Sequence, residues 1–112
     1  MRQIILDTSF IITAVKQKID FFDLIEGKGL QIIVPEQTIK ELKGLGAELA
    51  LKIIEKNKFK LINVPGRNAD NAIIKFAKEN PLAIVATLDK GLQKKVRNSK
   101  MVIRGRKKLE IT

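Results

Sequence analysis

The segment 82–87, LAIVAT, is apolar up to its last residue, and Pro81 precedes it directly. A short uninterrupted apolar run is typical of a strand whose two faces are both covered by other elements. Three further segments, 2–6, 30–34 and 59–64, also have the pattern of strands, and helical patterns lie between them. This alternation predicts a three-layer α/β/α fold around a mostly parallel central sheet of four to five strands.

The clearest helix follows the third strand. Its apolar residues recur at helical spacing from Ala69 to Ala77, and Asn80-Pro81 ends it. The other predicted helices are 9–16, 20–26, one that begins at Pro35, 47–56 and 90–97. A last strand near 101–104 precedes a basic tail over about 104–112. With 112 residues, the whole chain (1–112) is expected to form one domain.

The residue types that are absent exclude several kinds of chemistry. The chain has no His, Cys, Trp or Tyr. A Ser-His-Asp triad, a thiol nucleophile and a zinc site built on imidazole or thiolate are therefore excluded. Without Cys, without a signal-peptide pattern and without an apolar run long enough to cross a bilayer, the protein is expected to be cytoplasmic, with no membrane partner.

The charge is strongly basic and unevenly distributed. The formal net charge is +10, and the stretch 90–108 contains nine basic residues and no acidic one. Such a surface could simply be solvated, but a one-sided basic cluster attracts polyanions, meaning RNA, DNA or an anionic membrane, and favours a nucleic acid among them. The residues expected to contact RNA phosphates are Lys90, Lys94, Lys95 and Arg97.

Four carboxylates stand at positions where a parallel sheet would gather them. Asp7 directly follows the first strand, and Asp89 comes two residues after the fourth. Carboxyl ends of parallel strands face one edge, where ligand crevices form. Asp70 lies in the first turn of its helix, and Glu41 lies on the helix after the second strand. Each acid alone also has a structural interpretation, since Asp7 and Asp89 could cap helices, Asp70 could complement a helix dipole, and Glu41 could be solvated.

Clustered carboxylates repel one another unless a cation lies between them. Oxygen-only ligation favours a hard cation, Mg²⁺ or Mn²⁺. Such an ion beside a basic surface is suited to hydrolysis of a phosphodiester bond, because it lowers the pKa of a bound water and offsets charge on the phosphate.

The sequence resembles the PIN domain family of nucleases, and four stretches carry the resemblance. They are IILDTSFI with Asp7, VPEQTIKEL with Glu41, NADNAIIKFA with Asp70 and AIVATLDKGL with Thr87 and Asp89. The resemblance implies a metal-dependent endoribonuclease in which these four acids ligate the metal, while Thr8, Ser9 and Thr87 orient the ligands. The last stretch, with the basic helix after it, is most similar to the rRNA-processing branch of the family. The resemblance to the PIN family also implies that a homodimer could form, and the exposed face of the 47–56 helix is the expected contact.

Two positions depart from the family pattern. Ser9 replaces a frequent Asn, so that a hydroxyl stands where an amide is usual, and Gly91 stands where a second acid often follows Asp89. The Gly91 departure leaves a second metal site in question. It also keeps open an alternative function, that of a non-catalytic RNA- or pre-ribosome-binding module.

Three other functions were weighed against this one. A ribonuclease toxin of a toxin–antitoxin pair is a third interpretation, which a small antitoxin gene immediately upstream would identify. A haloacid-dehalogenase-type phosphatase needs a second Asp at position 9, and a response-regulator receiver needs paired acids after the first strand. Neither pattern is present.

Overall fold

A computed structural model describes all residues, 1–112. Six strands form one sheet in the order β3-β2-β1-β4-β5-β6. The strands are β1 (Gln3–Leu6), β2 (Gln31–Pro35), β3 (Lys60–Ile62), β4 (Ile84–Ala86), β5 (Lys100–Arg104) and β6 (Lys108–Ile111). The first five are parallel, and β6 pairs antiparallel with β5. The predicted fold class, an α/β fold with a mostly parallel central sheet, is confirmed.

The direction in which successive strands are added to the sheet reverses at β1. From β1 the chain proceeds to β2 and β3 on one side, and β4 then returns to pair with the other side of β1. The register places Leu6 beside Ala86, and the Asp7 amide donates to the Ala86 carbonyl at 2.9 Å. Ligand crevices in open parallel sheets form outside the carboxyl ends of the strands at such a switch point. The residues after β1 and β4 therefore occupy the expected place for a site.

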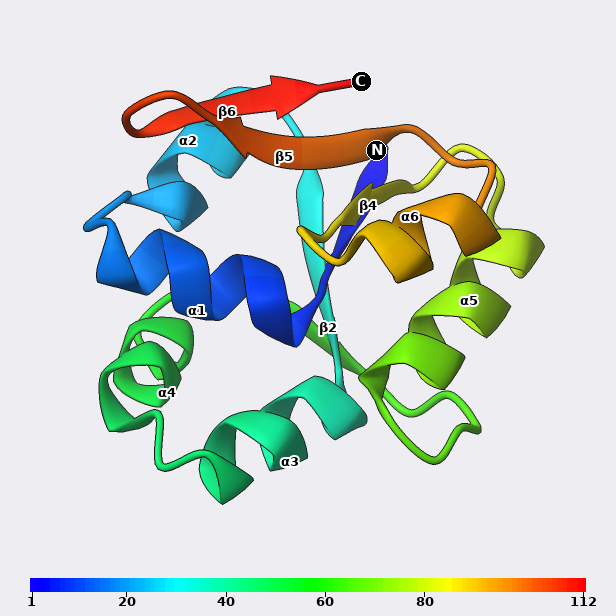
Figure 1. Cartoon of the computed structure of the whole chain (residues 1–112), viewed down its shortest axis with the longest axis horizontal. Coiled ribbons are helices and arrows are strands. Elements are labelled where there is room, and N and C mark those ends of the chain that lie inside the picture. The colour runs from blue at the N-terminus through cyan, green and yellow to red at the C-terminus, as the bar shows by residue number, and fades with distance from the viewer.

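Helices cover both faces of the sheet (Figure 1). They are α1 (Thr8–Lys16), α2 (Phe21–Gly27), α3 (Glu36–Gly44), α4 (Glu48–Glu55), α5 (Ala69–Glu79) and α6 (Lys90–Lys95). Alternate strand residues face opposite sides, as the pleat requires. Ile4 and Leu6 pack in one core with α1, α2 and α4, while Ile5 packs in a second core with α5 and α6. None of the helices combines the length and the apolar character needed to cross a membrane.

The carboxyl-terminal segment differs from the prediction. Residues 104–112 were expected to be a basic tail, but 108–111 form β6, which raises the number of strands to six. The turn that reverses the chain contains Gly105 and Lys107, both with positive φ. Leu109 packs against the first core, so one apolar side chain in a charged stretch anchors the strand.

Candidate active site

Asp7 occupies the switch point between β1 and β4 and is only 3% exposed. It is the N-cap residue of α1 by position, yet its side chain makes no capping hydrogen bond. Its Oδ2 atom instead accepts hydrogen bonds from the Thr87 hydroxyl at 2.7 Å and the Ser9 hydroxyl at 3.0 Å. The interpretation of Asp7 as a simple helix cap is therefore wrong.

The two hydroxyls are oriented toward Asp7 by the backbone that follows β4. The Asp89 amide donates to Thr87 Oγ1 at 3.1 Å, and the Leu88 amide donates to Ser9 Oγ at 3.2 Å. Each hydroxyl has one proton. Since both oxygens already accept from an amide, their protons are free to point at Asp7 Oδ2. Ser9 therefore holds the carboxylate, although it stands where an amide is usual in the PIN family.

Glu41, half-buried on α3, connects two other helices. Its Oε1 atom accepts from the Thr8 hydroxyl at 2.7 Å, and its Oε2 atom accepts from the Ala69 amide at the start of α5, at 2.8 Å. The alternative that Glu41 is merely solvated is wrong. Through these two bonds the side chain positions the beginning of α5, where Asp70 lies, relative to the beginning of α1.

Asp89 is exposed, and its side chain does cap a helix. Its Oδ1 atom accepts from the Gly91 amide at 2.8 Å and from the Leu92 amide at 3.2 Å, which fixes the start of α6. A Cβ atom at position 91 would lie 3.1 Å from that same oxygen. The glycine that replaces the expected second acid thus leaves room for the capping carboxylate. The structural interpretation of Asp89 is borne out for Oδ1, while Oδ2 has no hydrogen-bond partner within the chain.

The electrostatics join the four acids into one site. Burial raises the pKa of Asp70, and the negative charges of Asp7, Asp89 and Glu41 raise it further, whereas Lys95 lowers it. Burial also raises the pKa of Asp7, and the hydrogen bonds from Thr87 and Ser9 oppose that shift. The Asp70 carboxylate accepts no hydrogen bond within the chain. The four segments therefore concentrate negative charge that only Lys95 offsets at Asp70.

The site fits a hard divalent cation in its donor chemistry. It offers only oxygen ligands, the set that Mg²⁺ and Mn²⁺ prefer, and its carboxylates repel one another. No three acidic side chains stand close enough together to hold one ion as they are placed. Asp70 is the one acid whose carboxylate is free to rotate toward a cation, because the other three are held by hydrogen bonds. Asp89 is held through Oδ1 alone, which leaves its Oδ2 atom available as a ligand.

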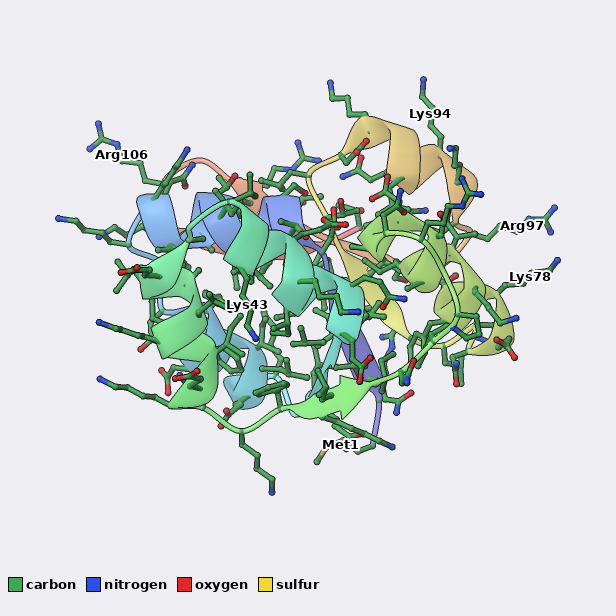
Figure 2. The ribbon with its side chains drawn as sticks, turned by 90° about the horizontal axis from the view of Figure 1, so that it is seen from below. Met1, Lys43, Lys78, Lys94, Arg97 and Arg106 are labelled. Atoms are coloured by element: carbon green, nitrogen blue, oxygen red, sulfur yellow. The ribbon has the colours of Figure 1, made fainter.

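The four basic residues predicted to contact RNA are all exposed, but they do not all face the acids. Lys95 is the one whose charge acts on Asp70. Figure 2 shows Lys94 and Arg97 pointing away from the body of the protein. The basic surface around α6 thus borders the acidic site: Lys95 is near enough for its charge to act on Asp70, while Lys94 and Arg97 point to solvent (Figure 2).

Two glutamines near the site were not identified from the sequence. Gln93 Nε2 donates to the Thr87 carbonyl at 2.8 Å, which ties α6 to the end of β4. Gln37 Nε2 donates to the carbonyls of Val64 at 2.7 Å and Gly66 at 3.0 Å. The Gln37 bonds join segments 27 and 29 residues apart, so no local pattern could indicate them, whereas Gln93 reaches a carbonyl only six residues before it.

Comparisons with known proteins agree with the observed fold. A family model described as a PIN like domain matches residues 4–108. Ribonuclease VapC4 of Methanocaldococcus jannaschii is 33% identical over an alignment that covers 99% of this chain and 97% of the relative. The solved structure of the PIN domain endonuclease Utp24 superimposes with a TM-score of 0.85 and 26% identity, covering 97% of this chain and 90% of that chain.

Proposed function

This chain belongs to the PIN-like domain family, and we propose that it is a divalent-metal-dependent endoribonuclease of rRNA processing or RNA turnover. One observation supports this most strongly. Three acids from separate segments, Asp7, Asp89 and Glu41, all place their negative charge near Asp70, at the switch point of the sheet and beside a basic helix. Such a concentration of carboxylates in a chain of net charge +10 is suited to a cation and a phosphate rather than to structure.

In this proposal Asp7, Glu41, Asp70 and Asp89 would hold Mg²⁺ or Mn²⁺. When bound, the ion supplies an activated water and offsets charge on the phosphate. The chain's own residues do the positioning. Ser9 and Thr87 keep Asp7 Oδ2 in place, and Thr8 does the same for Glu41 Oε1.

Lys95, whose charge acts on Asp70, would bind the phosphate next to the reacting one. Its charge also lowers the repulsion that an RNA strand meets on entering a carboxylate-rich site.

The proposal is tested by cleavage of an end-labelled single-stranded RNA with Mn²⁺, comparing the wild type with Asp7→Asn. Asp23→Asn is the matched control, because Asp23 is an exposed acid on α2, outside the four-carboxylate site. We expect cleavage by the wild type and the control, loss of cleavage in Asp7→Asn, and loss in all three after addition of EDTA. Equal residual cleavage by Asp7→Asn and the wild type would reveal a contaminating nuclease and refute the proposal.

A second function, an RNA-binding module that does not cleave, is favoured by one specific observation. The side chain of Asp89 already caps α6 through Oδ1, and no three acids are arranged to hold an ion. In that case the wild type and Asp7→Asn would bind RNA equally well, with the same salt dependence, and neither would cleave it.

A homodimer through the exposed face of α4, extended by Leu45 just before that helix, is part of the proposal. Leu45 and Leu49 are 64% and 62% exposed there, which favours contact with another surface. Light scattering of the wild type should give twice the mass of the chain, and Leu49→Glu should give a monomer.

A further inference from the structure

A polar groove of about 420 Å³ lies beside the acidic site, between α3 and the 63–68 loop, and Glu41 contributes to its lining. In Figure 1 this loop is the light green segment below α5, next to the beginning of α3. Only one of its ten lining residues is hydrophobic. Two of them, Lys40 and Arg67, are exposed cations, one on each side of the groove. The groove therefore adjoins the carboxylate site through Glu41, and its walls carry two cations, Lys40 and Arg67, beside the acids Glu36 and Glu41.

Neither cation makes an ion pair within the chain, although Glu36, one helical turn before Lys40 on α3, also lines the groove. The only ion pair of the protein is Arg104–Glu110, in the terminal hairpin. Glu41, which lines the same groove, directs both of its oxygens elsewhere, to the Thr8 hydroxyl and the Ala69 amide. Lys40 and Arg67 are therefore free to bind an anion that enters the groove.

The groove is built rather than formed by chance between mobile side chains. Gln37 Nε2 fixes the loop to α3 through the carbonyls of Val64 and Gly66, while its Oε1 atom is buried without a partner. An unpartnered buried oxygen is unfavourable, so the two donor bonds must set the orientation of this amide. On the other side of the loop, a Cβ at Gly66 would lie 2.8 Å from the Ala72 amide nitrogen. The loop is thus fixed to α3 and packed closely on α5.

We propose that this groove is a subsite for the nucleotide on one side of the scissile bond, with Lys40 and Arg67 binding its phosphate. The inference rests on the proposed function and adds to it the path of the strand. The RNA would run from α6, across the four carboxylates, into the groove between α3 and the 63–68 loop. The volume falls at the lower end of the range for small-molecule sites, which suits about one nucleotide, and the polar lining suits a sugar-phosphate rather than a stacked base.

The first test measures binding of a fluorescent single-stranded RNA in the Asp7→Asn background, so that cleavage does not interfere. The test variant is Lys40→Gln/Arg67→Gln, and the control is Lys56→Gln/Lys58→Gln. The control removes the same charge at the opposite, amino-terminal edge of β3. We expect the test variant to lower the slope of log affinity against log salt by about 0.7, because the two cations bind one phosphate and each phosphate contact with a single strand contributes about 0.7. Equal slopes for the test and control variants would overturn the proposal.

The second test locates the subsite relative to the cleaved bond. RNA substrates are lengthened by one nucleotide at a time, either before or after the cleavage site. In the wild type we expect one such extension, on one side only, to raise the cleavage rate. The Lys40→Gln/Arg67→Gln variant should cleave the extended and unextended substrates at the same rate. If it still responds to the extension as the wild type does, the subsite is refuted while the nuclease stands. If the wild type cleaves nothing, the proposed function fails, and the binding test alone decides on the groove.

Discussion

The two strand ends that meet at the switch point carry similar acids in opposite situations. Asp7 is buried, and although it occupies the N-cap position of α1, its side chain makes no capping hydrogen bond. Its Oδ2 atom accepts hydrogen bonds from two hydroxyls instead. Asp89 is exposed and uses Oδ1 to cap α6. Burying a carboxylate is unfavourable, and the usual compensation for an acid at a helix start is the cap. Asp7 is thus held by side-chain hydroxyls and contributes nothing to capping its helix, whereas Asp89 caps α6 in addition to the catalytic role proposed for it.

The largest difference in cleavage rate should appear between the two variants that each remove the charge of one of these acids. Asp7→Asn is expected to lower the rate of RNA cleavage by about 1,000-fold, because several kcal/mol of charge stabilisation corresponds to roughly that factor. Asp89→Asn, which keeps a capping oxygen, should lower the rate less. The measurement is single-turnover cleavage at saturating Mn²⁺. A smaller loss for Asp7→Asn than for Asp89→Asn would reverse the assignment of the two acids.

The next effect tests the hydroxyls that distinguish the Asp7 side of the site. Thr87→Val keeps the shape of the side chain but removes one donor to a buried carboxylate. We expect cleavage to fall by about 10- to 100-fold, as is typical when a ligand loses its supporting hydrogen bond. The free energy of unfolding should also fall, by about 1–3 kcal/mol, which urea denaturation would measure. Thr112→Val, at the chain terminus after β6, is the matched control and should change neither quantity.

A smaller effect is expected on the Asp89 side, where the cap can be separated from the charge. Asp89→Ala removes both the capping oxygen and the charge, and it should lower the free energy of unfolding by about 1 kcal/mol. Asp89→Asn removes the charge but keeps a capping oxygen, so the free energy of unfolding should be nearly unchanged. Thermal unfolding without metal would compare them. If the Ala and Asn variants are equally stable, the capping hydrogen bonds of Asp89 contribute nothing to the stability of the fold, and the structural role given to Asp89 is wrong.

Much of this arrangement could be predicted because it is local. A carboxylate directly after an apolar strand in a parallel sheet must lie at the ligand edge, which places Asp7, and Thr-x-Asp after the fourth strand places Thr87 and Asp89. The breaks at Gly27, Pro35 and Asn80 likewise set where helices begin and end. These features depend on neighbouring residues only.

The remaining features depend on contacts between distant segments. Glu41 reaches Thr8 and Ala69, which are 33 and 28 residues away, and no periodicity encodes that. The strand β6 was missed because the charges of 104–108 dominate its pattern, while its formation depends on pairing with β5 and on the burial of Leu109. The Gln37 contacts that shape the groove are likewise visible only in three dimensions.

The smallest effect concerns Asp70, whose carboxylate is repelled by the negative charges of both Asp7 and Asp89. Because its pKa is raised, the folded protein binds a proton at this site more tightly than the unfolded chain does. The unfavourable charge is therefore absent below the ordinary value of 3.8 and appears as the pH rises through the folded pKa. Asp70→Asn should be slightly more stable than the wild type at neutral pH and equal to it below that window. Urea denaturation from pH 3 to 7 would show this, and Asp23→Asn, an acid outside the site, should show no such difference.

If Mn²⁺ then stabilises the wild type but not Asp70→Asn, the cation relieves the repulsion at this carboxylate. A variant less stable than the wild type at neutral pH would mean that Asp70 is stabilised as an anion, and that Asp7 and Asp89 do not repel it.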